Sequence, residues 1–268
     1  MHESAITPFG LGLGSLMLLI PFAVLLWTRT GLLREAMIAV VRMAVQLLFV
    51  GLYLEWIFEL NHPFLNILWL GVMVIVADGA ILRRSGLRFS RLGTEMFGAM
   101  LLGAAVPLAI FLFVILSVND PLNARYMIPV GGMILGNCLR ANVVGLRSFY
   151  QTIRQQEKSY LYMLSQGASR TEALRPFLTD SLRDAFSPTI ATVATIGLVS
   201  LPGMMTGVIL AGRNPMEAIL YQIAIMIAIF TGTSITVLTG IQLTVRKSFS
   251  PYGLLRKEVF KKDQKQRK

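Results

Sequence analysis

The chain is poor in the residues from which catalytic and metal centres are usually built. Among 268 residues there is one cysteine, Cys138, and there are two histidines, His2 and His62. A single cysteine excludes an intrachain disulfide and a cluster of thiolate metal ligands. No grouping of serine, histidine and aspartate and no histidine-rich motif is present, so we expect no catalytic residues and no enzyme activity in this polypeptide.

A nucleotide-binding motif is also missing. No glycine-rich run ends in Gly-Lys-Ser or Gly-Lys-Thr, so the chain has no P-loop with which to hold nucleotide phosphates. We therefore expect that this chain binds no nucleotide cofactor. If it performs work, the energy must come from another subunit or from an ion gradient.

Charged residues are scarce and apolar residues abundant. Only 15% of residues are charged, 54% are hydrophobic and the mean hydropathy is +0.64, values typical of a membrane protein. Because a bilayer core about 30 Å thick requires roughly 20 helical residues, the apolar runs predict an all-α polytopic protein. Seven spans are expected, at residues 11–27, 36–57, 64–82, 96–118, 128–145, 189–210 and 219–245.

The positions of the basic residues predict how the chain is oriented in the membrane. Twenty-one of the 25 lysines and arginines fall into alternate gaps between the runs, and cytoplasmic loops collect such residues. The amino terminus is therefore expected outside and the carboxyl terminus inside. The net charge of +11 is spread over one membrane face and a basic tail at 249–268, which indicates anionic lipid as a partner and not nucleic acid. We expect the part of this tail from Arg256 to Lys268 to be solvated or to touch lipid.

One expected cytoplasmic segment, residues 146–188, is long and patterned. Its first half has apolar residues at mostly helical spacing up to Gln166, and Gly167 suits a helix end. Ser169 and Glu172 have the spacing of a capping box, which predicts a second, short amphipathic helix whose regularity Pro176 limits. This pattern is typical of a coupling element that meets a partner, although a loop lying on the membrane surface would have similar features.

Several segments carry a resemblance to a known family. The most specific is the block from Gly197 to Gly207, which reads Gly-Leu-Val-Ser-Leu-Pro-Gly-Met-Met-Thr-Gly; weaker segments are Arg42 to Gln46, Ile128 to Asn137 and Gly167 to Ser169. Together with Ala211 to Ile223 and Asp180 to Arg183, they cover most of residues 36–245. The chain resembles the FetB-type permeases, also called the UPF0014 group, which include bacterial iron-export permeases and plant aluminium-tolerance half-transporters.

The resemblance implies a permease subunit of an ABC transporter in the bacterial inner membrane. It implies a separate ATP-binding subunit that carries ATP and Mg, a second copy of this chain, and outward movement of iron or another metal-linked substrate. Four residues are expected to form the coupling turn: Gly167, Ala168, Ser169 and Glu172. Importers of the ABC class often carry Glu-Ala-Ala before the coupling glycine, whereas Leu161, Tyr162 and Met163 stand here.

The sixth expected span contains Pro202-Gly203, which should interrupt the helix and free carbonyl groups toward a cavity. Close packing of helices through Gly203 and Gly207 is the alternative explanation. The residues expected to line a translocation path are Gln46, Asn137, Ser200, Pro202, Gly203, Met204 and Met205.

A few charges lie in or near the spans. Arg42 is expected to reach back to the inner surface, Asp78 to pair with Arg83 or Arg84 at the interface, and Arg140 to face another helix. These charges leave a secondary transporter driven by an ion gradient as the second hypothesis. Glu55 and Glu59 are weak candidates for a metal site at the outer end of the second span, where a solvated acidic rim is the alternative.

Overall fold

The computed structural model describes residues 7–116, 120–199, 201–212 and 214–261. Helices dominate the described residues, and the β-type pairings among them are two isolated bridges, Leu87 with Phe260 and Phe249 with Leu255. The all-α prediction is confirmed. The chain divides into two compact units, residues 1–60 and 61–268.

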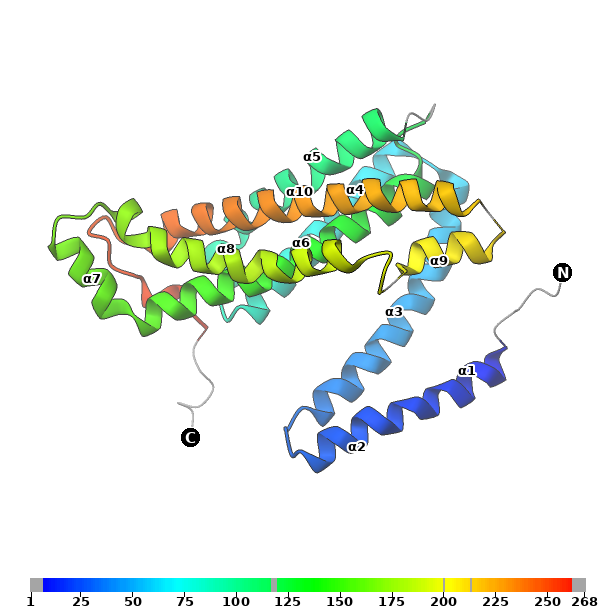
Figure 1. Cartoon of the computed structure of the whole chain (residues 1–268), viewed down its shortest axis with the longest axis horizontal. Coiled ribbons are helices and arrows are strands. Elements are labelled where there is room, and N and C mark those ends of the chain that lie inside the picture. Colours follow the sequence, from blue (N-terminus) through cyan, green and yellow to red (C-terminus); the bar gives the residue numbers. More distant parts are fainter. Residues whose placement is uncertain (1–6, 117–119, 200, 213, 262–268) are drawn as a thin grey trace. The chain divides into compact units, whose positions relative to one another are not determined.

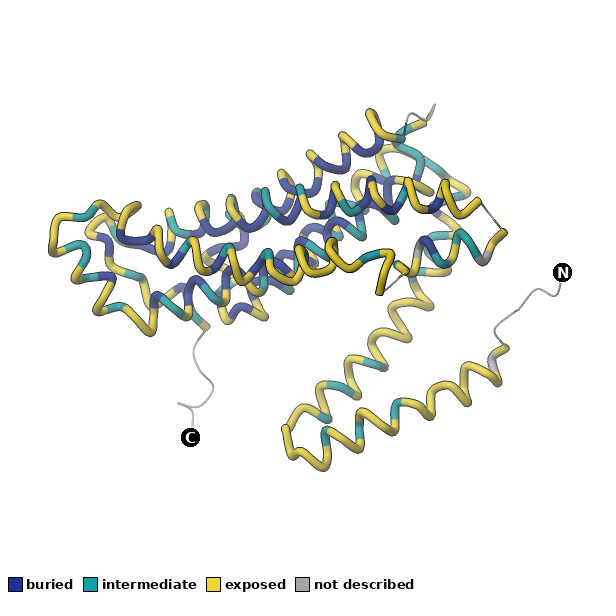
Figure 2. Tube along the Cα trace, in the orientation of Figure 1, coloured by how far each residue is buried: buried dark blue, intermediate teal, exposed yellow. Residues whose placement is uncertain are grey.

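Unit 1 is a helical hairpin. It contains α1 (Pro8–Ser15), the 3₁₀ turn η1 (Leu16–Leu18), α2 (Leu19–Trp27) and α3 (Leu33–Leu60). Thr7 begins α1, its hydroxyl accepting a hydrogen bond from the Gly10 N–H at 3.1 Å. Arg29 and Gly31 have positive φ angles of 49° and 72°, and they make the turn between α2 and α3. Most side chains of this unit are exposed (Figure 2).

Unit 2 is a bundle of long helices, α4, α5, α6, α8 and α10, with α7 at one end and α9 at the other (Figure 1). The bounds are α4 (Pro63–Arg84), α5 (Phe89–Ile110) followed by the π-helical turn η2 (Phe111–Ile115), α6 (Ala124–Gln155), α7 (Glu157–Ser165), α8 (Arg170–Thr195), α9 (Gly203–Leu210), α10 (Pro215–Ser248) and the 3₁₀ turn η3 (Lys257–Val259). The buried residues of α4, α5, α6 and α10 face the centre of this bundle (Figure 2).

Small residues allow the central helices to approach closely. A Cβ atom added to Gly232 of α10 would lie 2.8 Å from the Gly103 carbonyl oxygen of α5, and one added to Gly145 of α6 would lie 2.9 Å from Val237. Between α6 and α10, the buried Asn142 amide donates to the Thr236 hydroxyl at 2.9 Å. Interhelical contacts through small and polar residues are typical of packing in a bilayer.

Within the described ranges, six helical segments are long and apolar enough to cross a membrane: Phe9–Trp27, Leu33–Leu60, Pro63–Arg84, Phe89–Ile115, Ala124–Gln155 and Pro215–Ser248. They coincide with six of the seven expected spans. The seventh, expected at 189–210, is not one helix, because α8 ends at Thr195 and α9 begins at Gly203. A count of seven crossings and the orientation of the termini therefore stay predictions.

The span limits expected at 145/146 and 188/189 do not coincide with helix ends, and as limits of the membrane crossing they stay predictions. Helix α6 runs without interruption through residue 145 to Gln155, and α8 runs from the coupling turn through residue 188 to Thr195. Hydropathy reports where the surroundings change from lipid to water, whereas the backbone hydrogen bonds of a helix continue across that border. The expected short second helix is thus a 26-residue helix that contains both Pro176 and Pro188.

The segment after α10 is anchored to unit 2 by a few of its residues. Phe249 and Val259 are buried, the Arg88 N–H donates to the Val259 carbonyl at 2.8 Å, and Arg91 pairs with Glu258 at 2.7 Å. The expectation of a solvated or lipid-touching end from Arg256 holds for the exposed residues 256–258 and not for Val259 and Phe260, while residues 262–268 lie outside the described ranges. The many basic residues of this segment obscured three apolar residues that pack in or against the core: Phe249, Val259 and Phe260.

Candidate translocation path and coupling end

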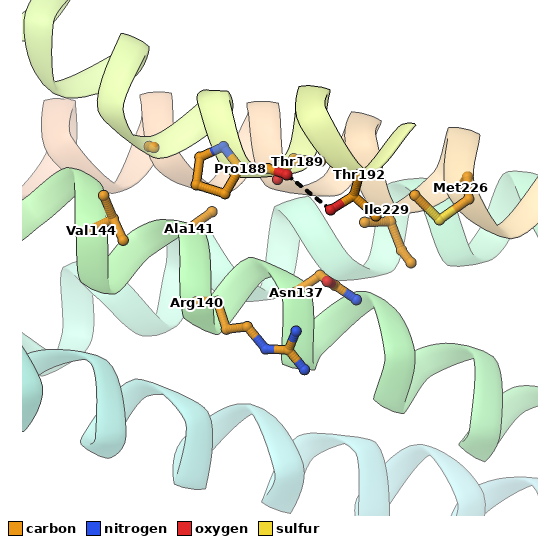
Figure 3. A pocket seen from close by; sticks show the side chains of 10 residues that line it. Asn137, Arg140, Ala141, Val144, Pro188, Thr189, Thr192, Met226 and Ile229 are labelled. Carbon is orange, nitrogen blue, oxygen red and sulfur yellow. Dashed lines mark hydrogen bonds between the residues drawn. The ribbon is translucent and has the colours of Figure 1, made fainter. Parts of the chain in front are cut away.

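A cavity of about 130 Å³ lies between α6, α8 and α10 of unit 2. Figure 3 shows Asn137 and Arg140 on α6 opposite Pro188 and Thr192 on α8, with Met226 of α10 beside them. Of these five, only Asn137 was expected to line a path. The Arg140 guanidinium points away from the α8 side chains in this view.

The polar groups of this cavity are held by their own helices. The Asn137 amide donates to the Met133 carbonyl at 2.8 Å, and the Thr192 hydroxyl donates to the Pro188 carbonyl at 2.9 Å. The Thr192 bond uses the carbonyl of a proline inside the helix. Both side chains retain an oxygen that can accept a hydrogen bond, so the cavity offers hydrogen-bond acceptors to a passing molecule.

The exposed surface of α6 and α8 is polar at depths where other helices are apolar. On α6, Arg140, Arg147 and Gln151 are exposed at helical spacing, and on α8 the Asp184 carboxylate accepts a hydrogen bond from Ser148 at 2.6 Å. Exposed side chains in the middle of α4, α5 and α10 are instead apolar, such as Ile75, Leu102 and Ile227. Because an arginine at the centre of a membrane helix costs about 3 kcal/mol, the α6–α8 face requires water or another protein surface beside it.

The interruption expected at Pro202-Gly203 is present. Residues 196–202 separate α8 from α9, Gly197 has a φ angle of +85°, and Pro202 precedes the first residue of α9. A second cavity of about 500 Å³ adjoins this break and is lined by Pro202, Met205 and Gln222, among others. Met226 lines both cavities, so the two are neighbours along α10.

The structure therefore places three of the expected path residues, Asn137, Pro202 and Met205, in two adjoining cavities, and Gly203 directly after Pro202. Ser200 and the side chain of Met204 lie outside the described residues. Gln46 is exposed on α3 in unit 1, so its part in a path stays a prediction.

The acidic residues proposed as weak metal ligands, Glu55 and Glu59, are likewise exposed on α3. Among the residues that the structure describes, no group of three or more histidine, cysteine, aspartate and glutamate side chains could hold a metal ion. A metal site at these two glutamates stays a prediction.

Asp78 is not the interfacial ion-pair partner that its sequence position indicated. Its side chain is buried on α4, and one carboxylate oxygen has no hydrogen-bond partner in the described part of the chain, while Arg83 and Arg84 are exposed. Asp78 points into the bundle because it shares a face with Val74 and Leu82, which sequence spacing could have shown.

The expected coupling turn joins α7 to α8. Gly167 ends α7 with a φ angle of +89°, a region that favours glycine, and the Ala168 N–H donates to the Met163 carbonyl. The capping box is confirmed: the Glu172 carboxylate accepts the Ser169 N–H at 2.8 Å, and the Ser169 hydroxyl accepts the Glu172 N–H at 3.3 Å. Hydrogen bonds from Ser169 lower the pKa of Glu172, which keeps this carboxylate charged at neutral pH.

Helix α7, which precedes the coupling turn, packs against α8 and against the segment after α10. The buried Tyr160 of α7 donates its hydroxyl proton to the Gly253 carbonyl at 2.8 Å, and its ring packs edge-on against Phe177 of α8 and Phe249. Burial raises the pKa of Tyr160, so the hydroxyl remains a donor. Displacement of α7 must therefore move α8 and the segment after α10 with it.

Residues that the sequence analysis missed include Pro188, Thr189 and Thr192 of α8 and Gln222 and Met226 of α10. The threonines gave a signal, since they interrupt an apolar run at a spacing of three residues and thus share a helix face. Met226 gave none, because methionine in an apolar helix is usually a packing residue.

Comparisons with known proteins agree with this architecture. The uncharacterised protein family UPF0014 matches residues 8–249. The Bacillus subtilis UPF0014 membrane protein YjkA is 32% identical over 81% of this chain and 84% of its own length. The probable iron export permease protein FetB of Escherichia coli is 30% identical over 93% of this chain and 95% of its own, and the Arabidopsis thaliana protein ALUMINUM SENSITIVE 3 is 31% identical over 85% and 82%.

No solved structure matches the chain. The family match spans both structural units and includes the helix break, the two cavities and the coupling turn. With its membrane helices, this chain is an integral membrane protein that belongs to the UPF0014 family of membrane permeases.

Proposed function

We propose that this chain is the membrane subunit of an ABC-type exporter, driven by ATP that a separate subunit hydrolyses. The observation that carries the proposal is that α8 runs from the coupling turn to the first cavity, while α6 runs from the same cavity to the start of α7. A displacement of α7 can therefore reach Asn137 along α6 and Thr192 along α8, each of which is one helix over that distance.

The cargo that we propose is iron or another metal, free or bound to a carrier molecule. This assignment rests on the name of the Escherichia coli relative, a probable iron export permease, and agrees with the aluminium sensitivity named for the Arabidopsis relative. A second copy of the chain would supply the polar neighbour that the α6–α8 face requires.

Partner binding tests the coupling turn. In the full-length protein, Gly167→Val should lose an ATPase subunit that co-purifies with the unchanged chain, because a branched side chain disfavours the left-handed φ angle and thickens the turn. Gly136→Val is the matched control, since a Cβ there meets nothing within 4 Å and the residue lies on α6. Equal ATPase binding by both variants, with both inserted in the membrane, would remove the coupling assignment.

Metal-stimulated ATP hydrolysis tests the cargo. The reconstituted pair should hydrolyse ATP faster with the transported species than in a metal-free control, and ferrous, ferric and other ions should differ. If no metal changes the rate while the subunits still bind each other, the metal assignment fails and the ABC assignment stands.

A secondary transporter is the alternative that one observation favours, the buried Asp78 with an unpartnered carboxylate oxygen. An ionisable group buried in a membrane helix can carry a proton or cation. Transport by proteoliposomes that contain this chain alone, driven by a pH gradient and lost in Asp78→Asn, would support this reading over the first.

A further inference from the structure

A third cavity, of about 530 Å³, lies where the first turns of α8 meet the last turns of α6 and α10. Three arginines stand around it, Arg170 and Arg175 from α8 and Arg246 from α10, and its floor includes Phe149, Leu174 and Val245. We call this cavity the arginine pocket. It shares no lining residue with the two cavities of the candidate path.

The arginine pocket carries unneutralised positive charge. None of its three arginines takes part in the ion pairs between described residues, which join Arg91 to Glu258, Arg183 to Asp180 and Lys247 to Glu95. One acidic residue, Glu172, also lines the pocket, so its single negative charge offsets one of the three arginines and leaves the lining positive. The charge therefore favours an anionic ligand.

The floor of the pocket is apolar. The half-buried Leu178 and Val245 present apolar surface to the pocket, and the buried core residues Phe149 and Leu174 line it as well. A small inorganic anion would leave this surface in contact with water. A ligand with an anionic group beside a hydrocarbon chain would cover both parts of the pocket.

The position of the pocket along α10 agrees with such a ligand. Ile241 and Val245 line it, and Ile241 follows Pro215 by 26 residues, so at 1.5 Å per residue the pocket begins about 39 Å from the other end of the helix. A bilayer measures about 40–45 Å with its polar headgroups. The arginine pocket thus lies at the headgroup layer on the side of α7, below any subunit that docks on the coupling turn.

We propose that the arginine pocket binds the headgroup of an anionic phospholipid from the leaflet on the side of α7. Arg175 and Arg246 hold the phosphate from the two sides of the pocket, and an acyl chain lies along the apolar floor. Basic pockets between membrane helices are typical sites for anionic lipid headgroups. The site requires no particular cargo, but it adjoins the coupling turn, because Glu172 belongs to both.

Native mass spectrometry of the full-length protein in neutral detergent tests this proposal. Phosphatidylglycerol should bind at least about tenfold more tightly than phosphatidylcholine, and the double variant Arg175→Gln, Arg246→Gln should lose that preference. The charge-preserving pair Arg175→Lys, Arg246→Lys should retain part of it. The three side chains are exposed, so the variants should keep the thermal midpoint of the unchanged protein.

The matched control is the double variant Arg84→Gln, Arg183→Gln, which removes the same charge from exposed positions outside the pocket. It should keep the lipid preference within about twofold. Equal loss in both double variants, or no loss in either, would overturn the proposal. Displacement of the lipid by millimolar inorganic phosphate would overturn it in favour of a free phosphate site, and loss of ATPase binding without loss of lipid binding would assign the pocket to the partner subunit.

Discussion

Gly232 is the position at which α10 passes the backbone of α5. A Cβ atom there would lie 2.8 Å from the Gly103 carbonyl oxygen and 3.0 Å from Ile134. The Gly103 oxygen belongs to the backbone of a long helix and cannot turn aside as a flexible side chain could. Close approach at this point sets the separation of the two helices.

We expect Gly232→Val to destabilise unit 2 by about 1–3 kcal/mol, because the added side chain must force α5 and α10 apart. The measurement is the thermal midpoint of the detergent-purified protein, which should fall by several degrees. Gly98→Val, on α5 with nothing within 4 Å of the added Cβ, should leave the midpoint nearly unchanged. Equal midpoints for both variants would show that the approach of the helices is not tight.

The capping box gives a second residue-scale prediction. Ser169→Ala should destabilise the first turn of α8 by about 1 kcal/mol, seen as faster hydrogen exchange of the amides at Thr171 and Glu172. Ser159→Ala, an exposed serine of α7, is the control and should leave those amides unchanged.

This protection should depend on pH. The pKa of Glu172 is lower in the folded protein than its ordinary value, because Ser169 hydrogen-bonds to the charged carboxylate. The stabilisation is then complete above the ordinary pKa of a glutamate and is lost as the pH falls through the lowered one. On acidification, the protection factor of the Glu172 amide should fall toward that of the Ser169→Ala variant, after correction for the slower intrinsic exchange at low pH. A protection factor that does not change with pH would contradict this assignment.

Local signals of this kind were readable from the sequence, and long-range ones were not. Gly167, Ser169 and Glu172 interact within five residues of one another, so their spacing alone predicted the helix end and the cap. The hydrogen bond between Asn142 and Thr236 joins residues 94 positions apart. Nothing local in the sequence shows that α6 and α10 bring those two side chains together.

At the scale of elements, the break between α8 and α9 depends on Gly197, whose φ angle of +85° costs other residues about 1–2 kcal/mol. Gly197→Ala should therefore change the course of residues 196–202 and the shape of the second cavity. We expect slower metal-stimulated ATP hydrolysis by the reconstituted pair, with membrane insertion retained.

Gly207→Ala is the control for this break. Gly207 lies inside α9, and a Cβ there meets nothing within 4 Å, so ATP hydrolysis should not change. If Gly197→Ala behaves like Gly207→Ala, the break does not shape the path. Impaired membrane insertion or a lower thermal midpoint of Gly207→Ala would instead support close packing through Gly203 and Gly207.

Helices were predicted correctly where contact with lipid requires an apolar sequence, and less well elsewhere. Six expected spans coincide with long helices because an apolar run is needed for each crossing. Helix α8 is too polar to be recognised in this way, and it continues from the coupling turn into the first part of the expected sixth span despite its internal prolines. The apolar residues of 249–260 were missed in a similar way, because charged residues lie beside them in the sequence.

At the scale of the whole molecule, orientation is the prediction to test first. In a Cys138→Ala background, Lys158→Cys on α7 should react with a membrane-impermeant maleimide only after the cells are opened. Asp120→Cys, at the opposite end of unit 2, should react in intact cells. Both native residues are exposed, and the native Cys138 is buried.

Each labelling site serves as the experimental control for the other. The reverse pattern would place the coupling turn outside the cell, where no ATP-hydrolysing subunit could reach it, and the proposed function would fail. Labelling of both sites in intact cells would indicate a topology other than the one that the basic residues predict.

The uninterrupted length of α6 has a mechanical consequence. At 32 residues the helix is about 48 Å long, with Arg140 near its midpoint, so a tilt of about 5° around its Ala124 end would shift the end beside α7 by about 4 Å and the midpoint by about 2 Å. The displacement at the cavity would therefore be about half of the displacement applied beside α7. Side chains at the cavity could then be repositioned without any helix unwinding.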